Sequence, residues 1–212
     1  MDQRETNTDA APGRTEHHKS FGYLLVGAAL GTVFFMTHHP TSVAGMTGIA
    51  GMVHGVMLLM VVALATGLVH FASGLGLSHL PVLTGLICYL AAAIANSLAA
   101  VVNGFVFPSL AARGEDEIGH DIFDFAWDLN QALAKLAVYA IALAYMLWSI
   151  QLLRKVPRQP WLAGLGLLAS VVPVGVLAAG GNAMDVSTAL VIYSIQVCWA
   201  ACVGVTMIRR GR

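Results

Sequence analysis

The chain has 212 residues, of which 58% are hydrophobic and only 10% are charged. Soluble domains carry about 25% charged residues, so this composition indicates an integral membrane protein rather than a soluble one. The formal net charge is zero, which gives no electrostatic reason to expect nucleic acid as a partner. The expected partner is the lipid bilayer, and the sequence leaves open a homo-oligomer or a larger membrane complex.

Six stretches are long and apolar enough to cross a bilayer, which takes about 20 residues of helix. In chain order they lie at about 21–37, 47–72, 81–107, 125–153, 161–180 and 186–208. No long linker or change of composition divides the chain. The predicted fold is therefore all-α, an integral membrane bundle of six transmembrane helices in one domain over residues 21–208. A disordered cytoplasmic tail is expected at 1–20 and a basic cytoplasmic tail at 209–212.

The basic residues predict the orientation of the bundle, because cytoplasmic loops are rich in Lys and Arg. Most of them fall before the first span, between the fourth and fifth spans, or after the sixth: Arg4, Arg14, Lys19, Arg154, Lys155, Arg158, Arg209, Arg210 and Arg212. With an even number of spans, these three groups share one face. Both the N and the C terminus are therefore expected in the cytoplasm, with the protein in a bacterial-type inner membrane.

Histidines mark the ends of the first two spans. His38 and His39 end the first span at the predicted outer face, and His54 lies in the first turns of the second span, which starts there. Ionisable side chains within spans are rare and usually face the interior of the bundle. His54 is thus interpreted either as a hydrogen-bonded structural residue or as a ligand.

The octet HGVMLLMV, at residues 54–61, resembles the histidine-bearing second span of the haem–copper oxidase main subunits over these few residues. The paired downstream histidines and the His-Tyr element of that family are absent from this sequence. None of its ligands is therefore assigned to this chain.

The fourth span is preceded by the stretch GHDIFDFAWDLNQALAK, residues 119–135, whose polar residues recur at spacings of 3, 4, 3 and 4. This spacing places on one helical face Asp121, Asp124, Asp128, Gln131 and Lys135. His120 and Asp124 are four residues apart, so both can reach one ion from the same face. One hypothesis is therefore a divalent transition metal or a haem b near the outer leaflet, bound by His38, His39, His54, His120 and Asp124.

The alternative interpretation of these polar residues before and within the fourth span is an acidic rim exposed to solvent. A helix over residues 122–153 would be about 48 Å long, whereas the hydrocarbon core is about 30 Å thick. Asp121, Asp124 and Asp128 would then lie above the lipid, while Lys135 could extend toward the interface or pair with a neighbour.

Amide side chains lie deeper in the third and sixth spans. Asn96 and Asn103 are seven residues apart and share a face, and Gln196 is near the middle of the last span. An unpaired amide in hydrocarbon costs several kcal/mol, so these groups should point inward. They are interpreted either as interhelical hydrogen bonds or as a polar track from the acidic face, formed by Asp128, Gln131, Lys135, Asn96, Asn103 and Gln196.

Three classes of function remain open from the sequence. They are a metal- or haem-binding membrane protein, a small proton- or cation-coupled transporter, and an accessory subunit of a larger complex. The sequence contains no phosphate-binding glycine loop, no G-x-S-x-G element, no H-E-x-x-H and no C-x-x-C. Whether the chain is an enzyme is left open.

Overall fold

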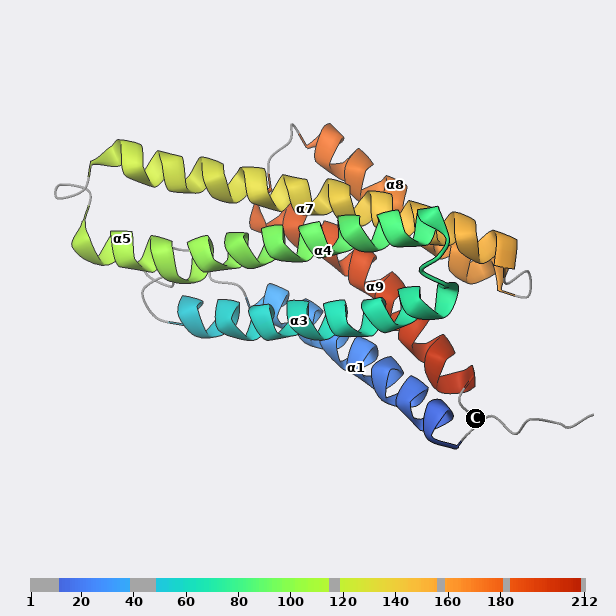
Figure 1. Cartoon of the computed structure of the whole chain (residues 1–212). Helices are drawn as coiled ribbons and strands as arrows, with labels where there is room; N and C mark the ends of the chain where they lie inside the picture. Colours follow the sequence, from blue (N-terminus) through green and yellow to red (C-terminus); the bar gives the residue numbers. More distant parts are fainter. Residues whose placement is uncertain (1–11, 39–48, 115–118, 156–158, 181–183, 211–212) are drawn as a thin grey trace, which may run out of the picture.

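The computed structural model describes residues 12–38, 49–114, 119–155, 159–180 and 184–210, and every element in this part of the chain is helical. Figure 1 shows the helices as a long bundle. In chain order the elements are α1 (Pro12–Thr37), α3 (Ala50–Leu75), α4 (Leu80–Val101), η1 (Val102–Val106), α5 (Phe107–Arg113), α7 (His120–Lys155), α8 (Pro160–Ala179) and α9 (Val186–Arg210). The element η1 is a short π-helix that joins α4 directly to α5.

The described residues contain six helices long and apolar enough to cross a membrane, which confirms the predicted number of spans. Helices α1 and α7 are longer than the apolar stretches predicted for them. Helix α1 begins at Pro12, so residues 12–20, expected in the tail, are helical, and α7 begins at His120 rather than near 125. The difference arises because hydropathy detects only the part of a helix that is apolar, whereas its polar turns continue beyond that part.

Each helix packs against two neighbours, in the order α1, α3, α4, α7, α8, α9 and back to α1. The two ends of the bundle differ in charge. The acidic end, where α3, α7 and α9 begin, carries Asp121, Asp124, Asp128 and Asp185. The basic end, where α1 begins and α9 finishes, carries Lys19, Arg154, Lys155, Arg209 and Arg210. In Figure 1 the acidic end lies at the left, beside α5, and the basic end at the right.

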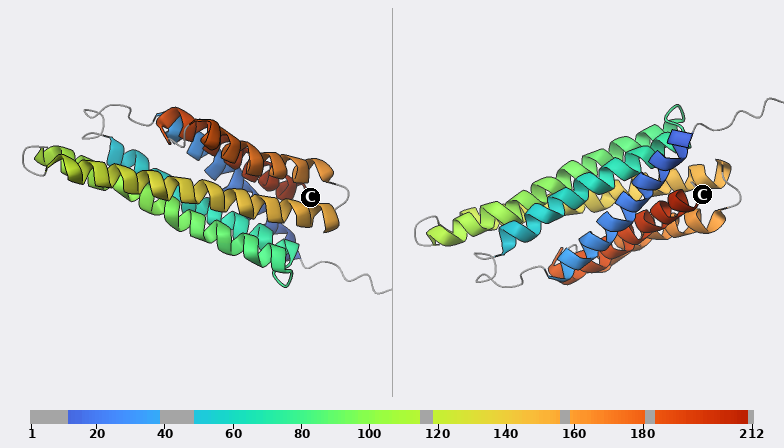
Figure 2. Two further views of the ribbon diagram at one scale, coloured as in Figure 1. Left: turned by 90° about the horizontal axis from the view of Figure 1, so that it is seen from above. Right: turned by 90° about the horizontal axis from the view of Figure 1, so that it is seen from below.

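Helices α1 and α9 lie side by side and touch through their backbones (Figure 2). A Cβ atom added at Gly204 would lie 2.7 Å from the carbonyl oxygen of Gly22, and one added at Gly22 would lie 2.7 Å from that of Gly204.

The spacing of four between Gly27 and Gly31 on α1, and between Gly51 and Gly55 on α3, also predicts close contact with a neighbouring helix. Gly31 and Gly51 do make such contacts, because a Cβ atom there would lie 2.7 Å from Sδ of Met60 and 3.4 Å from the carbonyl oxygen of Gly104, respectively. At Gly27 and Gly55, in contrast, a Cβ atom would meet nothing within 4 Å, so the spacing identified one glycine of each pair that faces a neighbouring helix.

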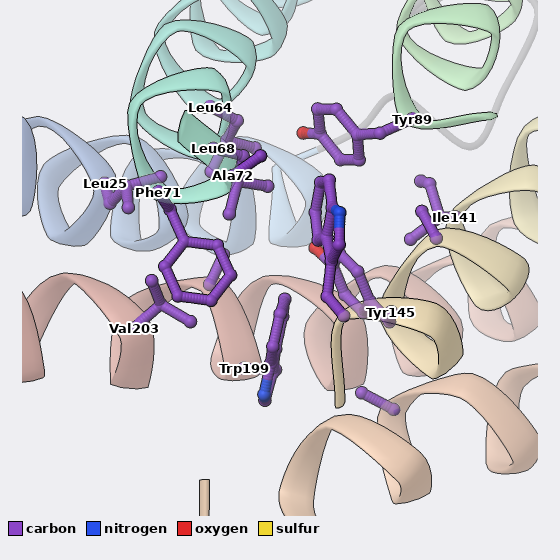
Figure 3. Packing of buried hydrophobic residues seen from close by; sticks show 14 of the residues in the cluster. Leu25, Leu64, Leu68, Phe71, Ala72, Tyr89, Ile141, Tyr145, Trp199 and Val203 are labelled. Carbon is purple, nitrogen blue, oxygen red and sulfur yellow. The ribbon is translucent and has the colours of Figure 1, made fainter. Parts of the chain in front are cut away.

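An aromatic core fills the half of the bundle nearer the basic end. Its side chains come from four helices: Phe71, Tyr89, Tyr145, Trp148 and Trp199. The rings of Tyr145 and Trp199 have centroids 4.2 Å apart, and Trp148 and Trp199 are stacked at 6.4 Å. Figure 3 shows Phe71, Tyr89, Tyr145 and Trp199 converging from their helices.

Glycines on the neighbouring helices make room for the two indoles. A Cβ atom at Gly85 would lie 2.7 Å from Nε1 of Trp148, and one at Gly166 would lie 2.7 Å from Nε1 of Trp199. The indole N–H of Trp148 donates to the carbonyl oxygen of Val82 at 3.2 Å. Both rings are therefore fixed by packing, and this half of the bundle is filled.

Candidate functional site

The half of the bundle nearer the acidic end contains a partly open cavity of about 310 Å³ between α1, α3, α4, α7 and α9. The aromatic core limits it toward the basic end, because Tyr89 and Tyr145 belong both to that core and to the cavity wall. Aliphatic side chains form much of the remaining wall, among them Val61, Leu64 and Ile141. The polar side chains that line it include Thr32, His54, Asn96, Asn103, Asn130, Asp185, Tyr193 and Gln196.

Gln196 is the most unusual of these residues. Its side chain is only 1% exposed, yet neither Oε1 nor Nε2 has a hydrogen-bond partner among the described residues. An unsatisfied buried polar group destabilises a protein by about 1–3 kcal/mol, so such a residue needs an explanation.

Asn130 contributes a second unpaired atom to the same cavity. Its Oδ1 is buried without a hydrogen-bond partner in the described part of the chain, and the residue is 5% exposed. In contrast, Tyr193 and Asn96 satisfy each other across the bundle, because the Tyr193 hydroxyl donates to Oδ1 of Asn96 at 2.7 Å. The cavity thus combines one closed polar pair with the two unsatisfied amides of Asn130 and Gln196.

His54 lies in the second turn of α3 and is 3% exposed. Its Nδ1 lies 2.8 Å from the carbonyl oxygen of Ala50. Because a carbonyl only accepts, Nδ1 carries a proton in this contact. A Cβ atom at Gly104 would overlap His54, so the absence of a side chain at Gly104 is what lets α3 approach η1 here.

The π-helical turn η1 places Asn103 on the cavity wall next to this contact. A π-turn inserts one extra residue into a helix and is often found at functional sites. Here it changes the rotation of the chain after α4, which is how Gly104 comes to face His54 while Asn103 reaches the cavity.

Charge is nearly absent from the cavity wall. Among the described residues that line it, Asp185 is the one carboxylate, and none is Lys or Arg. Asp185 caps α9: its Oδ1 accepts from the backbone N–H of Thr188 at 2.7 Å and from the Ser187 hydroxyl at 2.8 Å. These hydrogen bonds hold the pKa of the Asp185 carboxyl below its ordinary value, so its charge is already engaged at the helix end.

The structure does not bring the described candidates for a metal or haem centre together. His38 is exposed and lies on Phe34, with Nδ1 2.8 Å from the carbonyl oxygen of that residue. His120 and Asp124 are exposed on the first turns of α7, with Nε2 and Oδ2 3.8 Å apart. His39 lies outside the described residues. Within the described ranges, no group of three or more His, Cys, Asp or Glu side chains could hold a metal ion.

The residues of the predicted polar track divide into two groups. Asn96, Asn103 and Gln196 line the cavity with His54. Asp128 is exposed and Lys135 is half-buried, and neither lines it.

Gln131 is buried but bonds with the connection before α9 and does not line the cavity. Its Nε2 donates to the carbonyl oxygen of Met184 at 3.2 Å, and its Oε1 accepts from the Met184 N–H at 2.8 Å. The adjacent residue Asn130, which sequence reasoning missed, takes its place on the cavity wall. The available signal was the row of small or polar residues spaced by four, Ala126, Asn130 and Ala134, all of which are buried.

Comparison of the chain with protein-family models, with curated proteins and with solved structures finds no match.

Proposed function

We propose that this chain is a multi-pass membrane protein that binds a small, uncharged, amphipathic molecule in the cavity between α1, α3, α4, α7 and α9. The observation that carries the proposal is Gln196, a buried amide with two unpaired polar atoms at the wall of a 310 Å³ cavity. A bound molecule that pairs with these atoms removes their energetic penalty. Transport and docking to a larger complex stay predictions from the sequence.

The size and chemistry of the cavity support this class of ligand. Binding sites for small molecules have volumes of about 300–1,000 Å³ and combine apolar walls with a few polar groups that fix orientation. The volume of 310 Å³ lies at the lower limit of this range, so the ligand is small. Aliphatic and aromatic walls suit the apolar part of such a molecule, and the amides suit its polar part.

The nearly uncharged wall supports a neutral ligand over an ion. A charge moved out of water is strongly unfavourable unless an opposite charge or several hydrogen bonds compensate for it. Asp185, the one carboxylate on the described wall, is already engaged in capping α9. Asp128 and Lys135, the ionisable residues of the predicted transport path, do not line the cavity.

We further propose that the protein lies in an inner membrane with its basic end in the cytoplasm, as the distribution of Lys and Arg predicts. A fluorescent protein fused after Arg212 should then fluoresce, and alkaline phosphatase fused at the same position should be inactive. Active phosphatase with a dark fluorescent protein would reverse the orientation. This outcome would leave the cavity proposal untouched.

The binding proposal is tested by filling the cavity. Ala93 lines it, whereas Ala91, two residues earlier on α4, is exposed on the outside of the bundle. We expect Ala93→Phe to exclude the ligand, and Ala91→Phe, the matched control, to keep it. Each protein is purified in detergent, its organic extract is analysed by mass spectrometry, and its folding is checked by size-exclusion chromatography.

The expected result is a small molecule that co-purifies with the wild-type chain and with Ala91→Phe but is lost from folded Ala93→Phe. Extracts that are the same for all three proteins would contradict the proposal.

A further inference from the structure

The side chain of Gln196 specifies more than the presence of a ligand. A carboxamide presents a hydrogen-bond acceptor and a donor side by side on one edge. In Gln196 both are unpaired and the residue is 1% exposed, so the same molecule has to satisfy both. Its complement is another group with a donor beside an acceptor.

We infer that Gln196 recognises a neutral ligand that carries an adjacent donor and acceptor, such as an amide, a lactam or a protonated carboxylic acid. This inference rests on the proposed binding function and specifies its ligand class. The bound group accepts from Nε2 of Gln196 and donates to Oε1. Both hydrogen bonds form in either orientation of the amide, because the two partners are mutually complementary.

Ligands that only accept hydrogen bonds fit this site less well. A quinone, ketone or ether pairs with Nε2 but leaves Oε1 buried and unpaired. Sites that hydrogen-bond a polar ligand discriminate against analogues lacking the group mainly because protein atoms are then left unsatisfied. The unpaired Oδ1 of Asn130 also disfavours a ligand that only accepts hydrogen bonds, because it is a second acceptor on a residue that lines the cavity.

The hydrogen-bonded pair of Tyr193 and Asn96 does not offset the preference for a ligand that carries a donor. The Tyr193 hydroxyl already donates its proton to Asn96, so it has only acceptor capacity left for a ligand. The Tyr193 hydroxyl therefore also favours a ligand with a hydrogen-bond donor.

Three probes of nearly the same shape test the inference: benzamide, which has a donor and an acceptor, acetophenone, which has only an acceptor, and ethylbenzene, which has neither. Binding is measured by equilibrium dialysis against the full chain in lipid nanodiscs, and empty nanodiscs measure partition into lipid. The variants are Gln196→Leu and Gln196→Met. The control is Gln159→Leu, which changes a glutamine outside the cavity that bonds with Arg210.

We expect the wild-type chain and Gln159→Leu to bind benzamide at least about tenfold more tightly than acetophenone, a factor that corresponds to one unsatisfied buried group. This preference should vanish in both Gln196 variants, and their affinity for ethylbenzene should rise. Equal binding of benzamide and acetophenone by the wild-type chain, or a preference that persists without Gln196, would overturn the inference while leaving the binding function intact. Failure of all three probes to bind would instead count against the proposed function, with water as the occupant of the cavity.

Discussion

Replacement of Trp148 by alanine is expected to lower the free energy of unfolding by about 3–5 kcal/mol. The Trp148 side chain is fully buried (0% exposed) and contacts the rings of Phe71, Tyr89, Tyr145 and Trp199. The substitution removes these contacts and leaves a void in a part of the bundle that is otherwise filled. The midpoint of thermal denaturation in detergent should therefore fall sharply.

Trp161→Ala is the matched control for this substitution. Trp161 is 47% exposed at the start of α8, so its removal opens no internal void, and its denaturation midpoint should change little. Similar midpoints for the Trp148 and Trp161 variants would show that the aromatic core does not stabilise the bundle as described.

Replacement of Gln196 by leucine is expected to raise the free energy of unfolding of the ligand-free protein, whereas Trp148→Ala lowers it. In the ligand-free protein, both polar atoms of this buried side chain lack partners among the described residues. Leucine is similar in size and has no polar atoms, so the penalty of about 1–3 kcal/mol for an unsatisfied buried group is removed. The free energy of unfolding of ligand-free protein should therefore rise, although ligand recognition is lost.

Gln131→Leu provides the contrast, because it changes a buried glutamine that is satisfied. Gln131 is 7% exposed and exchanges two hydrogen bonds with the backbone of Met184. Leucine there leaves the Met184 N–H buried without its partner, which should lower the free energy of unfolding by about 1–3 kcal/mol. If Gln196→Leu destabilised ligand-free protein as much as Gln131→Leu does, then Gln196 would be a structural residue and the binding proposal would lose its main support.

The number and type of the helices could be predicted because lipid leaves few choices. Within hydrocarbon each backbone polar group must be satisfied internally, so an apolar stretch of sufficient length is helical. The same reasoning predicts that Asn96 and Gln196 point inward, and both line the cavity. Hydropathy could not locate the ends of α1 and α7, because their first turns are polar.

The predicted metal or haem centre depended on how different helices pack against one another, which spacing within one helix does not determine. His120 and Asp124 do share a face of α7, as their spacing predicts, but that face is exposed. Whether His54 meets them depends on the rotation and register of α3 against α7, which neither segment specifies alone. The structure instead packs His54 against Gly104 through a π-turn, a feature with no clear signal in a single sequence.

The sequence also does not determine which of the adjacent residues Asn130 and Gln131 faces the cavity. Neighbouring residues in a helix differ in direction by about 100°, so adjacent amides face different surroundings. The spacing of polar residues selected Gln131, which bonds to Met184, whereas Asn130 reaches the cavity. Only the packing of α7 against its neighbours distinguishes the two.

The most direct test of the central claim is the stoichiometry of the molecule extracted from the purified protein. We predict close to one uncharged molecule per chain in the wild-type protein and in Ala91→Phe, and almost none in folded Ala93→Phe. An extract in which no small molecule depends on the space beside Ala93 would contradict the account.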